Sequence, residues 1–358
     1  MAEQGRPRQE TMSSAERLGA VMMGQRPDRI PILPFAGGFC AKVIGIPIAR
    51  IYDDPEKSFW AQIWTQELIG YDGGPMFGYA SFGAWEFGGE IKMPSSEWEQ
   101  APIITKHPAR TPEEVDALEI PDVETAGFYP MALEFARIQQ QFGMPIQVMP
   151  IGGFTPAGNI AGLDKMCRWM VKQPEVAHKL LRKTVVFAKK VVDYYLDTFS
   201  PYPMSVMSGE ASAANQIISP RQFEEFAFPY IKEMHEYYLE RGLTSIFAHI
   251  CGEQNLNLPH WRKLPWGPAP ILSFGHEVDL TKAMEVFPDA VVAGNVEPRV
   301  IQEGTWQEVY ELAKTCIERA KYHPRGYMLM AGCDVPPQAP VFNIYALKKA
   351  VMDFGFYD

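Results

Sequence analysis

Apolar segments with the length of buried strands alternate along this chain with longer segments that predict helices. The first unit runs from the apolar stretch 30–36 into a predicted helix over 54–70, where Asp54 precedes Pro55 at the helix start. The count is close to eight units, and no Gly-x-Gly-x-x-Gly pattern follows the first strand. Strands that alternate with helices predict a parallel sheet. We therefore expect an α/β fold, a (β/α)8 TIM barrel, rather than a dinucleotide-binding sheet.

The rest of the chain keeps this alternation. Further predicted strands lie at 145–153, 204–212, 245–252, 269–276, 290–298 and 327–337. Further predicted helices lie at 111–120, 129–142, 164–199, 219–242, 279–287, 305–320 and 341–354. Thr111 with Glu114 forms a capping pattern, and the long helical segment 164–199 is expected to be broken or bent near Pro174. The region 71–110 is rich in glycine and aromatic residues and predicts a β-hairpin excursion.

The composition is that of a globular protein with a large core, since 47 % of the 358 residues are hydrophobic and 21 % are charged. We expect residues 1–358 to form one barrel domain, with residues 1–29 as an N-terminal extension and residues 71–110 as an insertion near the barrel mouth. The start of the chain is polar and no run of 18 apolar residues occurs, so we expect no secretory signal and no membrane partner. Five irregularly spaced cysteines predict a reducing, cytoplasmic location. The net charge of −10 argues against nucleic acid as a partner.

A candidate metal site lies at two of the predicted strand ends. His249 and Cys251 end the apolar run in TSIFAHICGE, and Cys333 ends the run in YMLMAGCDVPP. Zinc prefers nitrogen and sulfur ligands in a tetrahedron, and three protein ligands leave one position open, which is typical of a catalytic zinc. The alternative is that these thiols only pack, as Cys167 and Cys316 are expected to do on apolar helix faces. Because Cys333 follows Cys251 by 82 residues, no local zinc-finger spacing supports the site.

The position of other polar residues favours a functional site. In a TIM barrel the chemistry takes place at the C-terminal ends of the strands. The polar residues at those predicted ends are Glu210, His249, Cys251, His276, Asn295 and Cys333. We interpret Glu210, His276 and Asn295 as candidate catalytic residues. Each has a structural alternative: Glu210 can cap the next loop through Ser212 or nearby amides, His276 can cap the loop before Asp279, and Asn295 can be a turn residue.

Three stretches resemble a known family. HICG with the later GC, GNVEP before TWQEVYELAKTCIERA, and ISPRQFEEFAFPYIKEM resemble the uroporphyrinogen decarboxylase superfamily. They are most similar to its zinc-dependent methyltransferase branch, which serves corrinoid proteins and includes methylcobamide:coenzyme M methyltransferases and enzymes that act on methoxylated aromatics. The resemblance covers about residues 145–354, and the N-terminal third matches only loosely. It differs from true decarboxylases, because the stretch IPILPFAGGFCAK has no arginine after Arg29.

This resemblance implies a zinc ion held by His249, Cys251 and Cys333. It also implies transfer of a methyl group between a small molecule and the cobalt of a corrinoid protein, whose cobalamin the partner supplies. No Asp-x-His-x-x-Gly segment occurs in this chain, which agrees with a separate carrier. We expect the carrier to dock at a rim around Gly152, Gly153 and the 71–90 loops, and homo-oligomer formation stays open.

The identity of the small molecule is the least constrained part of this interpretation. The aromatic stretches 35–39, 76–87 and 154–159, read as loops, either pack as core and lid or line a broad apolar pocket. Few lysines or arginines occur in the loops expected at the mouth, which disfavours a sulfonate. An aryl methyl ether donor is therefore favoured. A methylcorrinoid:thiol methyltransferase of the coenzyme M type is the alternative, followed by a uroporphyrinogen decarboxylase-like enzyme or a non-catalytic corrinoid binder.

Overall fold

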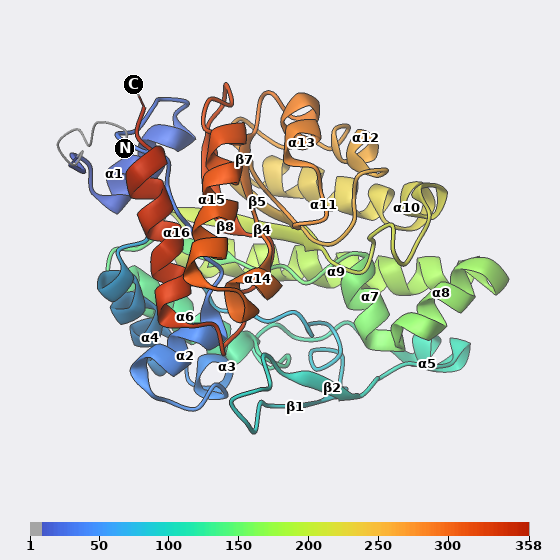
Figure 1. Cartoon of the computed structure of the whole chain (residues 1–358). Helices are drawn as coiled ribbons and strands as arrows, with labels where there is room; N and C mark the ends of the chain where they lie inside the picture. The colour runs from blue at the N-terminus through green and yellow to red at the C-terminus, as the bar shows by residue number, and fades with distance from the viewer. Residues whose placement is uncertain (1–8, 358) are drawn as a thin grey trace.

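Six parallel strands form the inner sheet of the molecule, in the order β3-β4-β5-β6-β7-β8. The computed structural model describes residues 9–357 (Figure 1). The strands are β3 (Ile146–Val148), β4 (Met204–Glu210), β5 (Ile246–Ile250), β6 (Ile271–Phe274), β7 (Val291–Val296) and β8 (Tyr327–Ala331). Sequential parallel strands with helices between them are the βαβ pattern that the sequence predicts.

Residues 30–33 continue this sheet beyond β8. Ile32 forms a parallel bridge with Leu329, whose N–H donates to the carbonyl of Pro31 at 2.9 Å. On the other side, the N–H of Asp72 donates to the carbonyl of Ile32 at 2.7 Å. Residues 30–33 and the segment at Asp72 thus extend the six-stranded sheet through single backbone contacts, where a closed barrel has its two remaining strands. The predicted (β/α)8 TIM barrel is confirmed. Of the predicted strand 30–36, only this short segment pairs, because proline has no backbone N–H to donate to a neighbouring strand.

Helices surround the barrel as expected. They are α1 (Ser14–Met22), α2 (Gly37–Ile44), α3 (Arg50–Asp53), α4 (Pro55–Ile69), α5 (Pro112–Ala117), α6 (Tyr129–Gln141), α7 (Phe154–Ala161), α8 (Leu163–Lys172), α9 (Pro174–Phe199), α10 (Pro220–Phe226), α11 (Phe228–Glu240), α12 (Leu258–Trp261), α13 (Leu280–Val286), α14 (Pro298–Glu303), α15 (Trp306–Ala320) and α16 (Val341–Phe354). The predicted caps are present: Asp54 accepts from the N–H of Lys57 at 3.0 Å, and Thr111 with Glu114 forms a capping box. None of the described helices is long and apolar enough to cross a membrane.

Three local predictions were wrong. The segment 219–242 is two helices, because Pro229 lacks the N–H that would continue α10 into α11. The stretch 154–159, which was interpreted as a loop, is the start of α7, and most of 35–39 belongs to α2. Only residues 146–148 of the predicted strand 145–153 pair in the sheet.

Helix α1 closes the end of the barrel where the strands begin. Val21 of α1 packs inside the barrel with Val291 and Met328, which lie at the starts of β7 and β8. Beside it, the buried carboxylate of Asp72 accepts hydrogen bonds from Arg17 at 2.6 Å and from Arg29 at 2.7 Å. The barrel mouth is therefore the opposite end, where the strands finish.

The predicted hairpin insertion is present and lies at the mouth. Strands β1 (Glu90–Lys92) and β2 (Ile103–Lys106) are antiparallel (Figure 1). The loop between them contacts the segment that follows β8: the Gln100 amide donates to the Asp334 carboxylate at 3.1 Å, and the Gln338 amide donates to the Glu97 carbonyl at 2.6 Å. The insertion thus holds in place the loop that carries Cys333.

Candidate metal centre

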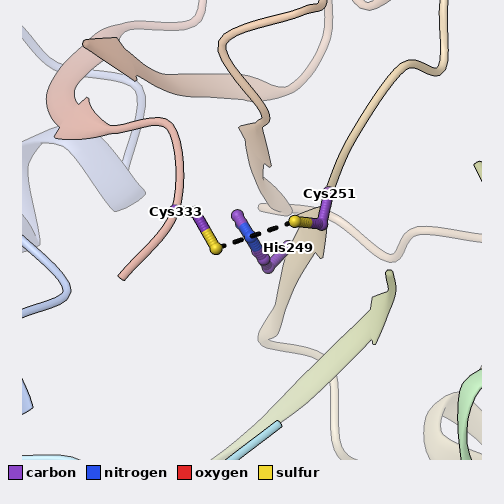
Figure 2. Close-up of side chains that lie close together, drawn as sticks. All are labelled: His249, Cys251 and Cys333. Atoms are coloured by element: carbon purple, nitrogen blue, oxygen red, sulfur yellow. Dashed lines mark hydrogen bonds between the residues drawn. The ribbon is translucent and has the colours of Figure 1, made fainter. Parts of the chain in front are cut away.

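His249, Cys251 and Cys333 meet at the barrel mouth. His249 lies on β5 with its ring directed into the barrel, and Cys251 follows two residues later, so the period-two alternation of a strand brings both to the same side. Cys333 reaches them from the loop after β8 (Figure 2). The ligand atoms of all three residues lie within 4.8 Å of one another. These are the three residues in which the sequence predicts a metal site.

The separation of the two sulfur atoms fits a tetrahedral zinc ion. Cys251 Sγ lies 3.7 Å from Cys333 Sγ. Two sulfurs bound to zinc at ~2.3 Å with a tetrahedral angle between them would lie about 3.8 Å apart. One imidazole and two thiols are also the donor types that zinc prefers. The arrangement therefore accommodates zinc without movement of the two thiols.

The histidine ring is oriented for metal binding. Its Nδ1 lies 3.1 Å from the hydroxyl of Ser273, and its Nε2 is buried with no hydrogen-bond partner among the described residues. A proton on Nε2 would be buried without an acceptor, so we place the proton on Nδ1, where it donates to Ser273. The lone pair of Nε2 then faces the two sulfurs. Phe35 fixes the ring from one side, with an edge contact of 5.2 Å between ring centroids.

The two thiols form a hydrogen bond in which Cys251 Sγ donates to Cys333 Sγ at 3.7 Å. A hydrogen bond from Cys251 holds the pKa of the Cys333 thiol well below its usual range, while the same bond raises the pKa of Cys251. The pair behaves as a coupled unit in which Cys333 ionises first. A thiolate is the form of cysteine that binds metals.

We expect Ser273→Ala to weaken zinc binding by about 10- to 100-fold, the usual effect of removing the group that orients a metal-bound histidine. Competition with a chromophoric chelator measures the zinc affinity directly. Ser208→Ala is the matched control, because Ser208 contacts the buried ring of His235 at 2.8 Å on the outer face of the neighbouring strand. Equal zinc affinities in the two variants would contradict the assigned role of Ser273.

The structure places Glu210 away from these ligands. Its buried carboxylate accepts from the N–H groups of Phe154 and Thr155 at 2.6 and 2.8 Å, and from the Thr155 hydroxyl at 2.6 Å. Burial raises the pKa of Glu210 to about 7, and these three hydrogen bonds oppose that shift. The side chain therefore joins the end of β4 to the start of α7. These contacts match the structural alternative for Glu210, a carboxylate that binds backbone amides, except that its side-chain partner is Thr155 rather than Ser212.

His276 and Asn295 occupy different positions near the mouth. The Asn295 amide donates to the carbonyls of Gly275 and Val278 at 3.0 and 2.8 Å, so it supports the loop after β6. His276 is exposed, and its Nδ1 lies 3.3 Å from Glu277. Its backbone lies against Gly332, where a Cβ atom would come within 2.6 Å of the His276 nitrogen. His276 thus lies at the edge of the mouth beside the Cys333 loop, whereas the Asn295 side chain is hydrogen-bonded within the barrel wall.

Gly152 and Gly153 are buried rather than exposed on a rim. A Cβ atom at Gly152 would collide with Met234 at 2.4 Å, and one at Gly153 would collide with Glu210 at 2.3 Å. Gly153 also has φ = +96°, which favours glycine. Both glycines allow close packing behind the barrel wall, which corrects the expectation that they form part of a cofactor-binding or docking rim.

Two residues of the site escaped the sequence interpretation. Ser273 pairs with His249 in the β5–β6 register, and Phe35 contacts the His249 ring. A signal for Ser273 exists, since it is the one polar residue in the apolar run ILSF. Phe35 belongs to the aromatic stretch 35–39, for which the sequence leaves core packing and pocket lining both open, but its contact with His249 has no signal in the sequence.

Known proteins share the family and the fold of this chain. The sequence model of the family described as uroporphyrinogen decarboxylase (URO-D) matches residues 13–354. A methylated-thiol–coenzyme M methyltransferase of Methanosarcina mazei is 22 % identical over 270 residues, which cover 71 % of this chain and 66 % of that protein, slightly under two thirds of its length. A uroporphyrinogen decarboxylase of an Anaeromyxobacter species is 24 % identical over 258 residues, 70 % of each chain. The solved structure of a methyltransferase from Methanosarcina mazei matches with a TM-score of 0.77 at 21 % identity and covers 96 % of this chain and 99 % of that one, so the two share a fold.

Proposed function

The chain belongs to the uroporphyrinogen decarboxylase (URO-D) family, and from this membership and the three-ligand site we propose that it is a zinc-dependent methyltransferase acting with a corrinoid protein. In this proposal a methyl group moves between a small molecule and the cobalt of that partner. The observation that carries it is the convergence of the His249 Nε2 lone pair with two sulfurs 3.7 Å apart. Three ligands leave an open position for a substrate atom, as catalytic zinc sites do.

Zinc in such a site acts as a Lewis acid, which favours the thiolate form of a bound thiol and stabilises the departing oxygen of a bound ether. The protein's own residues prepare that position. Cys333 enters as the thiolate, and Ser273 fixes the tautomer of His249. Phe35 and Phe247 make edge contacts with each other at 5.7 Å between centroids and keep an apolar wall beside the ligands. An apolar wall strengthens the electrostatic interactions of the open position.

Charges near the ligands favour an uncharged methyl donor. The carboxyl group of Asp334 belongs to the residue after Cys333, and burial raises its pKa to about 7, so it carries only about half a negative charge at neutral pH. Glu277 also contributes a negative charge near Cys251. An anionic sulfonate would meet these carboxylates, whereas an aryl methyl ether would not. We therefore retain the aryl methyl ether as the favoured donor. The thiol reaction is the second candidate, because the relative from Methanosarcina mazei is described as a methylated-thiol–coenzyme M methyltransferase.

The family also contains decarboxylases, but two buried arginines in the N-terminal part of this chain are not placed to bind a polycarboxylate ligand at the mouth. Arg17 and Arg29 lie at the closed end of the barrel, both buried and both paired with Asp72. The positive charges of both arginines are thus neutralised, and both side chains lie far from the mouth. This arrangement favours methyl transfer over decarboxylation of a tetrapyrrole and over passive corrinoid binding, since neither of those uses an open zinc position.

Metal analysis combined with a methyl-transfer assay tests the proposal. The zinc-loaded protein is incubated with free cob(I)alamin and a panel of methoxyarenes, or with methylcobalamin and a panel of thiols, and the cobalt absorbance bands report the transfer. Methylation from an arene supports the favoured donor, and demethylation by a thiol supports the second candidate. A zinc-loaded protein that transfers methyl groups with neither panel, whether the cobalamin is free or bound to a corrinoid protein, would refute the proposed function.

We expect Glu210→Gln to keep about one zinc per chain, because the side chain binds the start of α7 rather than the metal ligands. The variant should lose about 1–3 kcal/mol of unfolding free energy, since an amide cannot accept all three hydrogen bonds that the carboxylate accepts. Metal analysis and urea unfolding measure the two effects. Loss of zinc from the folded variant would instead identify Glu210 as a fourth ligand.

A further inference from the structure

Large apolar side chains are exposed around the barrel mouth. Five of them form a set that we name the apolar rim: Trp98, Ile217, Leu256, Trp306 and Phe342. Their exposed fractions range from 42 % for Ile217 to 72 % for Trp98. Exposed apolar groups that gather on one face of a protein mark interaction sites. Resting on the proposed function, we propose that the apolar rim is the docking face for the corrinoid protein, and that the partner presents a basic surface to it.

The rim residues lie on segments that follow the barrel strands or contact the loop after β8. Ile217 and Leu256 are on the loops after β4 and β5, and Trp306 and Phe342 are in the first turns of α15 and α16, which follow β7 and β8. Trp98 is on the loop of the hairpin insertion, which hydrogen bonds to the Cys333 loop. The segments that carry all five therefore lie at the end of the barrel that contains His249, Cys251 and Cys333.

The segments that carry the rim are strongly acidic. The loop of the insertion (93–102) and the segments that follow β4 to β8 (211–219, 251–257, 275–279, 297–305 and 332–340) contain eight carboxylates and a single basic residue. That residue, Arg299, is paired with Glu303 at 2.8 Å. Three lysines reach these segments from neighbouring elements: Lys92 pairs with Glu99 at 3.1 Å, and Lys42 and Lys282 donate to the carbonyls of Ala339 and Asn255 at 3.2 and 3.3 Å. Negative charge is thus in excess, and an excess of one sign around an apolar contact surface selects a partner of the opposite sign and accelerates the encounter. This is the reason for assigning a basic docking surface to the partner.

Side-chain amides hold these loops in fixed positions. Asn215 on the loop after β4 donates to Asn257 at 2.9 Å and accepts from the N–H of Leu256 at 3.1 Å. Asn255 donates to the Glu277 carbonyl at 2.9 Å and accepts from the N–H of Asp279 at 3.1 Å. The loops after β4, β5 and β6 are thus linked to one another. A rigid face loses little conformational entropy when a partner binds, which suits repeated docking and release.

The test compares carrier-bound with free cobalamin. The rim variant Trp98→Ser/Phe342→Ser is compared with the wild type and with a control variant, Trp64→Ser/Phe142→Ser. Trp64 and Phe142 are exposed to similar degrees, 51 % and 46 %, but lie on α4 and at the end of α6, outside the mouth segments. Each protein is assayed with free cobalamin and with corrinoid proteins of the source organism, produced one at a time with cobalamin bound.

We expect the rim variant to raise the KM for the carrier by about 10-fold or more, the usual effect of removing central aromatic anchors from an interface. Its rate with free cobalamin should stay within about twofold of the wild type, since neither side chain touches the ligands, and the control should match the wild type in both assays.

Glu97→Lys, which reverses an exposed charge beside Trp98, should also raise the KM for the carrier. Added salt should lower the turnover with the carrier but not the turnover with free cobalamin.

Three results would overturn the proposal while leaving the function intact. The first is that the rim variant and the control give the same KM for the carrier. The second is that no corrinoid protein gives the wild type a higher rate than free cobalamin does. Sedimentation can also show that the rim variant dissociates a dimer, which would make this face a contact between two copies of the chain. Failure of the wild type with free and carrier-bound cobalamin alike would instead refute the proposed function itself.

Discussion

Cys333→Ala protein is expected to contain almost no zinc, whereas the wild type should contain about one zinc per chain. The remaining ligands, His249 and Cys251, lie together at the end of β5 and cannot complete a three-point site. Loss of a partner that only orients a ligand weakens metal binding 10- to 100-fold, so loss of the ligand itself should exceed about 100-fold. Mass spectrometry of the metal content measures the first effect, and the methyl-transfer assay should show a rate that falls in parallel.

Cys167→Ala is the control for this prediction. Cys167 is a half-buried thiol on α8 that is absent from the ligand cluster, so its removal should leave zinc content and turnover unchanged. Circular dichroism should show that both variants remain folded, because the core of the barrel does not contain the metal ligands. A Cys333→Ala protein that retains stoichiometric zinc would refute the metal centre.

Asp72→Ala should destabilise the protein by about 3–5 kcal/mol, the cost of removing one partner from a buried ion pair. The carboxylate accepts from Arg17, Arg29 and the N–H of Ile32 at 2.6–3.0 Å, and both arginines are almost completely buried. Asp28 and Glu10 remain as partners for the two arginines, which places the expected loss toward the lower end of this range. Urea unfolding measures the change in free energy.

Asp164→Ala is the matched control, because the Asp164–Arg110 pair at 3.1 Å is exposed and should contribute less than about 1 kcal/mol. Zinc affinity should be unchanged in Asp72→Ala at temperatures where the variant is folded, since Asp72 lies at the closed end of the barrel. A loss of stability equal to that of the control would mean that the buried network is not a major source of barrel stability.

Periodicity and caps made most of the fold predictable. Alternating apolar segments identified the barrel, and Asp54 and Thr111 marked helix starts that the structure confirms. The first stave could not be predicted in this way, because residues 30–33 pair mainly through Ile32 and depend on a distant strand for that pairing. Pairing between segments 300 residues apart leaves no local pattern in the sequence.

The candidate site shows which information a sequence lacks. His249 and Glu210 both end apolar strands, but Gly209 rather than Glu210 pairs with His249 in the register of β4 and β5. Since side chains alternate along a strand, a shift of one residue sends Glu210 to the outer face of the barrel. Register is set by contacts between strands, so the sequence predicted that Glu210 lies at a strand end but not the direction of its side chain.

The ends of the described chain lie at the closed end of the barrel, and this determines how the protein can be immobilised or fused to another protein. Near the start of the described chain, Glu10 pairs with Lys348 of the last helix at 2.8 Å, and Arg29 forms a bridge with Phe356. Both ends of the described chain are therefore fixed beside α1, away from the hairpin (Figure 1). A surface coupled through an added tag at either terminus would leave the mouth facing solution. A fused enzyme meant to deliver substrate would instead need a linker long enough to pass along the outside of the barrel.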